Sequence, residues 1–170
     1  YDKTDEESID SYVLGLGAKF DLKPAYVNTT ISYLQNAGNY GDPNVGTVSY
    51  TFNAMLGTSI LQAQPGVDGF EDSTLMQGTL VAGFRVSPMV NLEAGLGYMS
   101  AEVDLLPDVT VEQTSMIYYA QAWMSMSENV HIIPEIGVVD RGDLEVDVAG
   151  VDDFENGKMT YLDVSFRYEF

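Results

Sequence analysis

The chain has 170 residues, contains no cysteine, and carries 7 Lys and Arg against 26 Asp and Glu, a formal net charge of −19. The lack of cysteine excludes disulfides, thiolate metal sites and thiol nucleophiles. The acidic balance argues against nucleic acid as a partner, because phosphate binding needs cationic side chains. No apolar run reaches the roughly 20 residues that a membrane-spanning helix needs, so a helical membrane protein is excluded.

The first half of the chain contains two segments that alternate polar and apolar residues. Residues 11–22 and 25–35 alternate with period two, which predicts two β-strands. Pro24 fixes φ in the short link between them. Residues 36–46 are rich in Asn, Gly, Asp and Pro and are expected to form a loop. Residues 47–61 fit either a further strand or a short helix, and the pattern leaves both open.

The second half repeats the alternation with short links. Strands are predicted at residues 74–86, 90–99, 114–126, 130–138 and 158–170. Loops are expected at residues 103–112 and over the acidic stretch 140–157, whereas Ser87-Pro88 and residues 127–129 reverse the chain tightly. Because no helical period is sustained, this succession of hairpins predicts a single antiparallel all-β domain over residues 1–170.

The two faces of these strands differ in a way that indicates a membrane. The polar face has glycine and charged residues deep within strands, while aromatic and other large side chains stand near strand ends on the apolar face. The latter are Phe20, Phe84, Tyr98, Met126, Tyr168 and Phe170. Aromatic residues form girdles at both water interfaces of a transmembrane barrel, whereas a soluble barrel such as a lipocalin would point its apolar set inward. We therefore predict an antiparallel up-and-down transmembrane β-barrel.

The number of strands depends on the long segment 36–73. Transmembrane barrels have short turns on the periplasmic side and long loops outside. If this segment is one long loop or a constriction inside the barrel, seven strands cross and the chain is the carboxyl-terminal part of a larger barrel. If residues 47–61 cross, the resulting eight strands suffice for a small complete barrel.

The closing strands carry a recognisable pattern. The run PEIG at residues 134–137 precedes a loop and a last strand that ends at Phe170. That strand is entered through Gly157, Lys158, Thr160 and Tyr161. This arrangement resembles the closing strands of porins from sulfate- and metal-reducing Gram-negative bacteria. The resemblance implies a general diffusion porin of the outer membrane, commonly a trimer, whose chain is much longer than this one.

A porin needs no catalytic group, only a water-filled lumen whose charges bias which ions pass. The polar-face candidates for lining such a pore are Lys19, Asp21, Arg85, Glu93, Glu135, Asp163, Arg167 and Glu169. Because carboxylates outnumber cationic groups, cations should be favoured. Asp163 and Arg167 lie too far apart on one strand to pair and are expected to bridge to neighbouring strands. The alternative is a small closed barrel of structural or surface-binding type, whose charges pair and fill a narrow interior.

Other chemistry is disfavoured by the residues present. The single histidine, His131, is expected to be a satisfied interior or interfacial residue, so a Ser-His-acid triad is not indicated. Asp152, Asp153 and Glu155 lack the spacing of a calcium loop and are expected to be solvated. We therefore expect no enzymatic activity, no cofactor and no metal site. The expected partners are membrane lipid, small solutes and ions, and further copies of the chain.

Overall fold

The computed structural model describes residues 9–36, 64–65, 69–106, 109–147 and 154–170. Every regular element in these ranges is a β-strand. Within the same ranges there is no helix long and apolar enough to cross a membrane.

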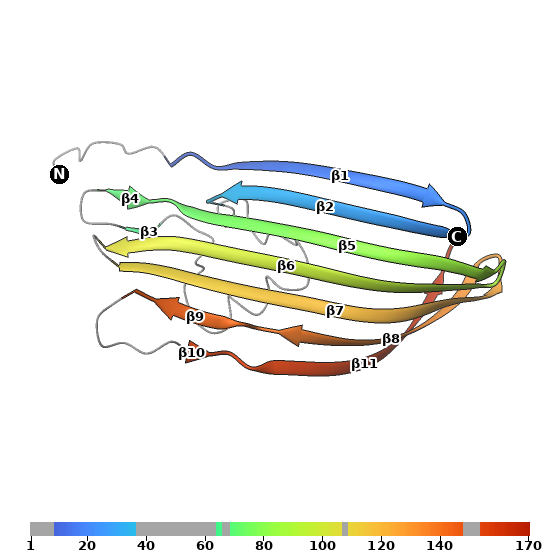
Figure 1. Cartoon of the computed structure of the whole chain (residues 1–170). Coiled ribbons are helices and arrows are strands. Elements are labelled where there is room, and N and C mark those ends of the chain that lie inside the picture. The colour runs from blue at the N-terminus through green and yellow to red at the C-terminus, as the bar shows by residue number, and fades with distance from the viewer. Residues whose placement is uncertain (1–8, 37–63, 66–68, 107–108, 148–153) are drawn as a thin grey trace.

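Seven long strands form one antiparallel sheet in the order β1-β2-β5-β6-β7-β8-β11 (Figure 1). They are β1 (Tyr12–Leu22), β2 (Ala25–Gln35), β5 (Ser73–Ser87), β6 (Val90–Leu106), β7 (Val109–Ser127), β8 (Val130–Asp140) and β11 (Lys158–Tyr168). The short strands are β3 (Gln64–Pro65), β4 (Phe70–Glu71), β9 (Asp143–Val146) and β10 (Phe154–Glu155). The predicted all-β antiparallel meander is therefore confirmed. Its three tight turns lie at the end of the sheet where β11 ends (Figure 1), which we call the turn end; the opposite end is the loop end.

Two predicted loops are wrong. Residues 103–112 belong largely to β6 and β7, which extend to Leu106 and from Val109. The acidic stretch 140–157 contains β9, which pairs with β7, and β10, which pairs with β9. In both places the side chains on one face of the strand are polar or acidic. Such residues are typical of loops, so the period-two alternation was not recognised there.

The sheet is open between β1 and β11 in the described residues. Residues 47–61 lie outside those residues, but β2 and β5, which flank them, pair directly from Ala25↔Phe84 to Gln35↔Thr74. No strand can therefore lie between β2 and β5. Because seven is an odd number, β1 and β11 run in the same direction and cannot pair with each other antiparallel.

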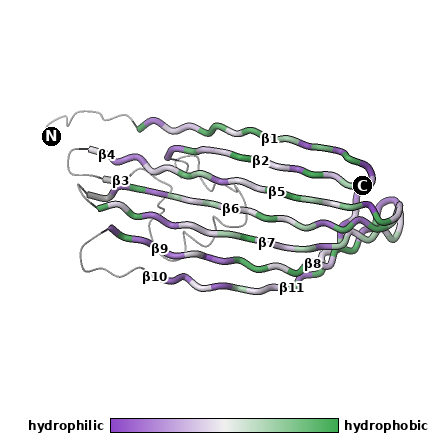
Figure 2. Tube along the Cα trace, viewed as in Figure 1, coloured by the Kyte–Doolittle hydropathy of each residue, from purple (hydrophilic) through white to green (hydrophobic). Residues whose placement is uncertain are grey.

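The two faces of the sheet have different exposure near the turn end. On β6, Leu92 is 47% exposed and Leu96 is 41% exposed. Gly95 and Gly97, the two residues adjacent to Leu96, are buried. We call the face of Leu92 the outer face and the face of Glu93 the inner face. Val164 and Phe166 on β11 are also exposed on the outer face. Figure 2 shows hydrophobic and hydrophilic residues alternating along the strands.

The alternation inverts towards the loop end. Beyond Tyr98, the outer face of β6 carries Ser100, Glu102 and Asp104, while the inner face carries Met99, Ala101 and Val103. These three inner residues form a buried cluster together with Leu34, Leu75 and Val111. On the outer face, Ser100 Oγ donates to Glu112 Oε1 at 3.2 Å, and Thr110 Oγ1 donates to Asp104 Oδ1 at 2.6 Å. On β6 the loop-end half is thus apolar inside and polar outside.

A β-bulge joins β8 to β9. Between the pairs Met116↔Asp140 and Gln113↔Leu144, β7 has two residues and the facing chain has three, so one residue is extra. Gly142 takes a φ of +59° there, and a Cβ at this position would overlap the carbonyl oxygen of Thr114. The positive φ and the close approach both require glycine.

Replacing Gly142 by Ala should therefore lower the free energy of unfolding more than replacing Gly157, which has a φ of +73° but nothing within 4 Å of a Cβ. Gly157→Ala should cost about 1 kcal/mol for its backbone conformation alone. Gly142→Ala adds a clash with backbone that cannot move aside. Urea unfolding in detergent micelles would measure both; equal costs would show that the bulge tolerates a side chain.

Candidate pore-lining face

The register of the sheet places four predicted pore-lining carboxylates in one row. Across the inner face, from β1 to β11, the facing residues are Asp21, Tyr26, Gly83, Glu93, Gln121, Glu135 and Asp163. Asp21, Glu93, Glu135 and Asp163 come from four strands that are distant in sequence. We call these four residues the carboxylate row.

Glu93 is the most heavily hydrogen-bonded member of the row. Its Oε2 accepts from Tyr26 Oη at 2.7 Å, and its Oε1 accepts from Tyr119 Oη at 3.1 Å. Gln121 Nε2 also donates to Oε1. Three neutral donors therefore hold this partly buried carboxylate in one position, and such donors can stabilise a charge without cancelling it.

Three tyrosine rings lie across glycines on the inner face. Tyr26 covers Gly83, Tyr119 covers Gly95, and Tyr161 covers Gly137, each pair being direct neighbours in the register. Tyr161 Oη donates to Glu135 Oε1 at 2.6 Å, as Tyr26 and Tyr119 donate to Glu93. Each glycine leaves the space that the tyrosine ring fills. An aromatic ring that covers a glycine on the neighbouring strand stabilises the sheet at that position.

A glutamate two residues before a covered glycine occurs twice. Glu93 precedes Gly95 and Glu135 precedes Gly137, and in both cases the tyrosine on the next strand covers the glycine and donates to the glutamate. The repeated Glu-x-Gly is visible in the sequence, but which tyrosine faces it follows only from the register. The donors Tyr26, Tyr119 and Gln121 were therefore missed in the sequence analysis.

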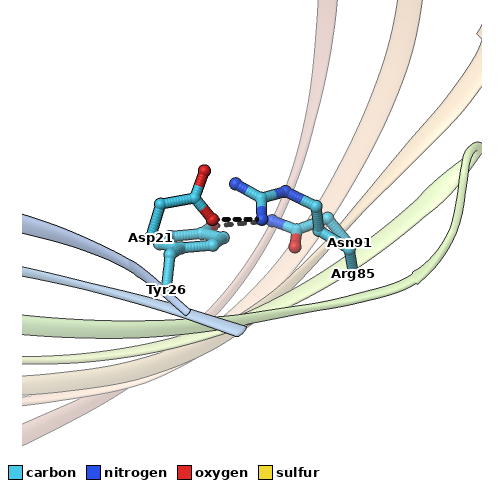
Figure 3. A network of polar contacts seen from close by, with 4 residues as sticks. All are labelled: Asp21, Tyr26, Arg85 and Asn91. Atoms are coloured by element: carbon cyan, nitrogen blue, oxygen red, sulfur yellow. Dashed lines mark hydrogen bonds and ion pairs between the residues drawn. The ribbon is translucent and has the colours of Figure 1, made fainter. Parts of the chain in front are cut away.

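The row continues into an ion pair near the turn end (Figure 3). Arg85 Nη1 lies 3.0 Å from Asp21 Oδ1, and the guanidinium stands 5.0 Å from the centre of the Tyr26 ring. Asn91 Nδ2 donates to Tyr26 Oη at 2.7 Å. Asp21 and Arg85 are both substantially exposed, so this pair adds little stability of its own.

The remaining predicted charges behave differently. Lys19 has no ion-pair or hydrogen-bond partner among the described residues. Arg167 Nε pairs with Glu169 Oε1 at 3.2 Å, and Glu169 lies just beyond the end of β11. The expectation that Arg167 reaches a neighbouring strand for its ion partner is wrong, but its guanidinium does reach across β8 to stand 5.4 Å from the Trp123 ring centre. Asp163 accepts from Ser165 Oγ at 2.9 Å.

His131 has a partner, as expected, since its Nδ1 lies 3.0 Å from Ser125 Oγ. Among the residues that the structure describes, no group of three or more His, Asp or Glu side chains is placed to hold a metal ion. Asp152 and Asp153 lie outside these residues.

No protein-family model, curated protein or solved structure matches this chain. The function is therefore inferred from the geometry of the chain alone, and the resemblance to porins stays a prediction.

Gly95→Ala should destabilise the sheet because the new Cβ would overlap the Tyr119 ring and push its hydroxyl away from Glu93. We expect a loss of about 1 to 3 kcal/mol in the free energy of unfolding, the usual cost of overpacking. Urea unfolding in micelles would measure it. Gly15→Ala is the matched control, since its Cβ would meet Ser32 Cβ at an ordinary 3.7 Å. Equal stability of the two variants would contradict a packing role for Gly95.

Proposed function

We propose that this chain forms part of an outer-membrane β-barrel that acts as a porin, a passive diffusion channel for small hydrophilic solutes and ions with a preference for cations. Its outer face at the turn end contacts lipid, and its inner face lines an aqueous lumen.

The observation that carries this proposal is the length of the outer apolar band. On β6 the band runs from Val90 to Tyr98, nine residues, and ends where Ser100, Glu102 and Asp104 take over the outer face. A strand tilted by about 45° crosses the hydrocarbon core of a bilayer in about 9 to 11 residues. The inverted loop-end half would then stand outside the bilayer in water, where a polar outer face belongs.

Exposed aromatic residues at both limits of the band support the same placement. Phe20, Phe84 and Tyr168 lie on the outer face towards the turn end, and Tyr33 and Tyr98 lie towards the loop end. Such residues favour the two water interfaces of a membrane. A soluble protein would have no reason to leave so large an apolar surface uncovered.

The carboxylate row supports a preference for cations. Four acidic side chains at one level of the inner face resemble the charged rings that select cations in other channels. Arg85 neutralises Asp21 in part, but Glu93 and Glu135 are held by neutral donors. The row therefore keeps a net negative charge.

An open sheet with an odd number of strands supports a barrel larger than this sheet. To close the sheet into a barrel, a further strand would have to pair antiparallel with the edge strands β1 and β11, which run in the same direction. Closure therefore needs at least one strand beyond these seven. This agrees with the longer chain that the resemblance to porins implies.

The second candidate is a small closed barrel of structural or surface-binding type. The tyrosine rings and the three donors around Glu93 favour it, because they resemble the packed interior of a narrow barrel. A filled interior would not conduct ions. Conductance therefore separates the two candidates.

In planar bilayers the protein should form open channels whose reversal potential in a salt gradient shows a preference for K⁺ over Cl⁻. The double variant Glu135→Gln/Asp163→Asn should lower that preference by roughly fourfold per charge, since one charge at about 10 Å in water shifts the energies of a cation and an anion by about 0.4 kcal/mol in opposite directions. Glu102→Gln, on the outer face at the loop end, is the control and should change nothing. Protein that folds and inserts without conducting would favour the closed barrel, and a preference for Cl⁻ would refute the selectivity.

A further inference from the structure

A pocket of about 460 Å³ opens on the inner face near the turn end, beside the carboxylate row. Its lining includes Lys19, Asn28, Arg85, Trp123, Ser125 and His131. These residues come from five strands, β1, β2, β5, β7 and β8, and Asn91 and Glu93 add β6 to the lining. The volume is in the range of small-molecule sites.

The pocket brings cationic groups together in a strongly acidic chain. Lys19 and Arg85 both line it, and Lys19 has no ion-pair partner among the described residues. Arg85 forms an ion pair with Asp21, but the Arg85 side chain remains 42% exposed. Glu93 also lines the pocket, and its carboxylate, which keeps its charge, accepts hydrogen bonds from Tyr26, Tyr119 and Gln121. Lys19 and Arg85 carry two positive charges against this one, so an anionic group on a solute would meet a net positive charge in the lining.

The uncharged part of the lining points to a ring that carries hydroxyl groups. Trp123 provides a flat indole ring, with His131 at 6.0 Å between ring centres and the Arg167 guanidinium 5.4 Å from the Trp123 ring centre. Asn28, Asn91 and Ser125 carry groups that both donate and accept hydrogen bonds. The side-chain oxygens Asn28 Oδ1 and Asn91 Oδ1 are buried and have no hydrogen-bond partner within the part of the chain that the structure describes. A hydroxyl can donate to these oxygens, whereas benzoate has no hydroxyl to offer them.

We propose that this pocket binds sugar acids, with the carboxylate of the solute near Lys19 and Arg85 and its ring against Trp123. The inference names a solute class for the channel and so rests on the proposed function. The pocket adjoins the carboxylate row, so its cations offset the repulsion that an anionic solute meets there.

Trp123 is the single tryptophan of the chain, so its fluorescence reports on this pocket. Purified protein in detergent should show a saturable change in emission with glucuronate, at lower concentrations than with glucose or benzoate. Lys19→Gln should weaken glucuronate binding about fivefold, the effect of losing about 1 kcal/mol from an exposed charge pair, and leave glucose unchanged. Lys23→Gln, in the β1–β2 turn and outside the lining, is the matched control and should bind as the unaltered protein does.

Equal affinity for glucuronate and glucose, equal affinity for benzoate, or no saturable change would each overturn the proposal. Because binding is measured in detergent, it is independent of conduction. Channels that conduct without binding glucuronate would leave the porin function standing and remove this site. Binding without conductance would remove the porin function and leave the pocket as a sugar-acid site of a closed barrel.

Discussion

Each face of a β-strand must suit the medium that it meets, and in this protein the polarity of both faces changes along the strands. β6 shows the change most clearly, because its outer face is apolar up to Tyr98 and polar from Ser100, while its inner face becomes apolar at Met99. One continuous strand with period two can satisfy both halves only if its hydrophobic face switches. The turn-end half therefore has an apolar outer face and a polar inner face, and the loop-end half has a polar outer face and a packed core inside. Under the proposed function, the turn-end half meets lipid outside and water inside.

In the turn-end half the inner face is polar, and hydrogen bonds hold its side chains in place. The tyrosines that cover Gly83, Gly95 and Gly137 fill space left by absent side chains, and their hydroxyls fix Glu93 and Glu135. Packing and charge placement therefore depend on the same three rings. A carboxylate held in this way keeps its position and its charge without needing a cation beside it.

Much of the architecture was predictable from the sequence. Period-two alternation located all seven long strands, with β1, β2 and β5 close to their observed bounds, and the Pro-containing and Ser-Glu-Asn links marked the tight turns. Two loops were predicted wrongly because acidic residues in strands such as β9 are typical of loops elsewhere. Seven of the eight pore-lining candidates lie in the strands predicted for them, and Glu169 lies just beyond the end of β11. The tyrosines and the glutamine that donate hydrogen bonds to Glu93 and Glu135 were missed.

The sequence by itself determined which residues share a face, because neighbouring side chains on a strand must point in opposite directions. Only the tertiary structure decided which strands are neighbours and how they align. That alignment brings Asp21, Glu93, Glu135 and Asp163 to one level, sets Tyr119 over Gly95, and joins β2 directly to β5. Register is a relation between distant segments, fixed by pairing and packing across the whole sheet, and no local pattern of residues contains it.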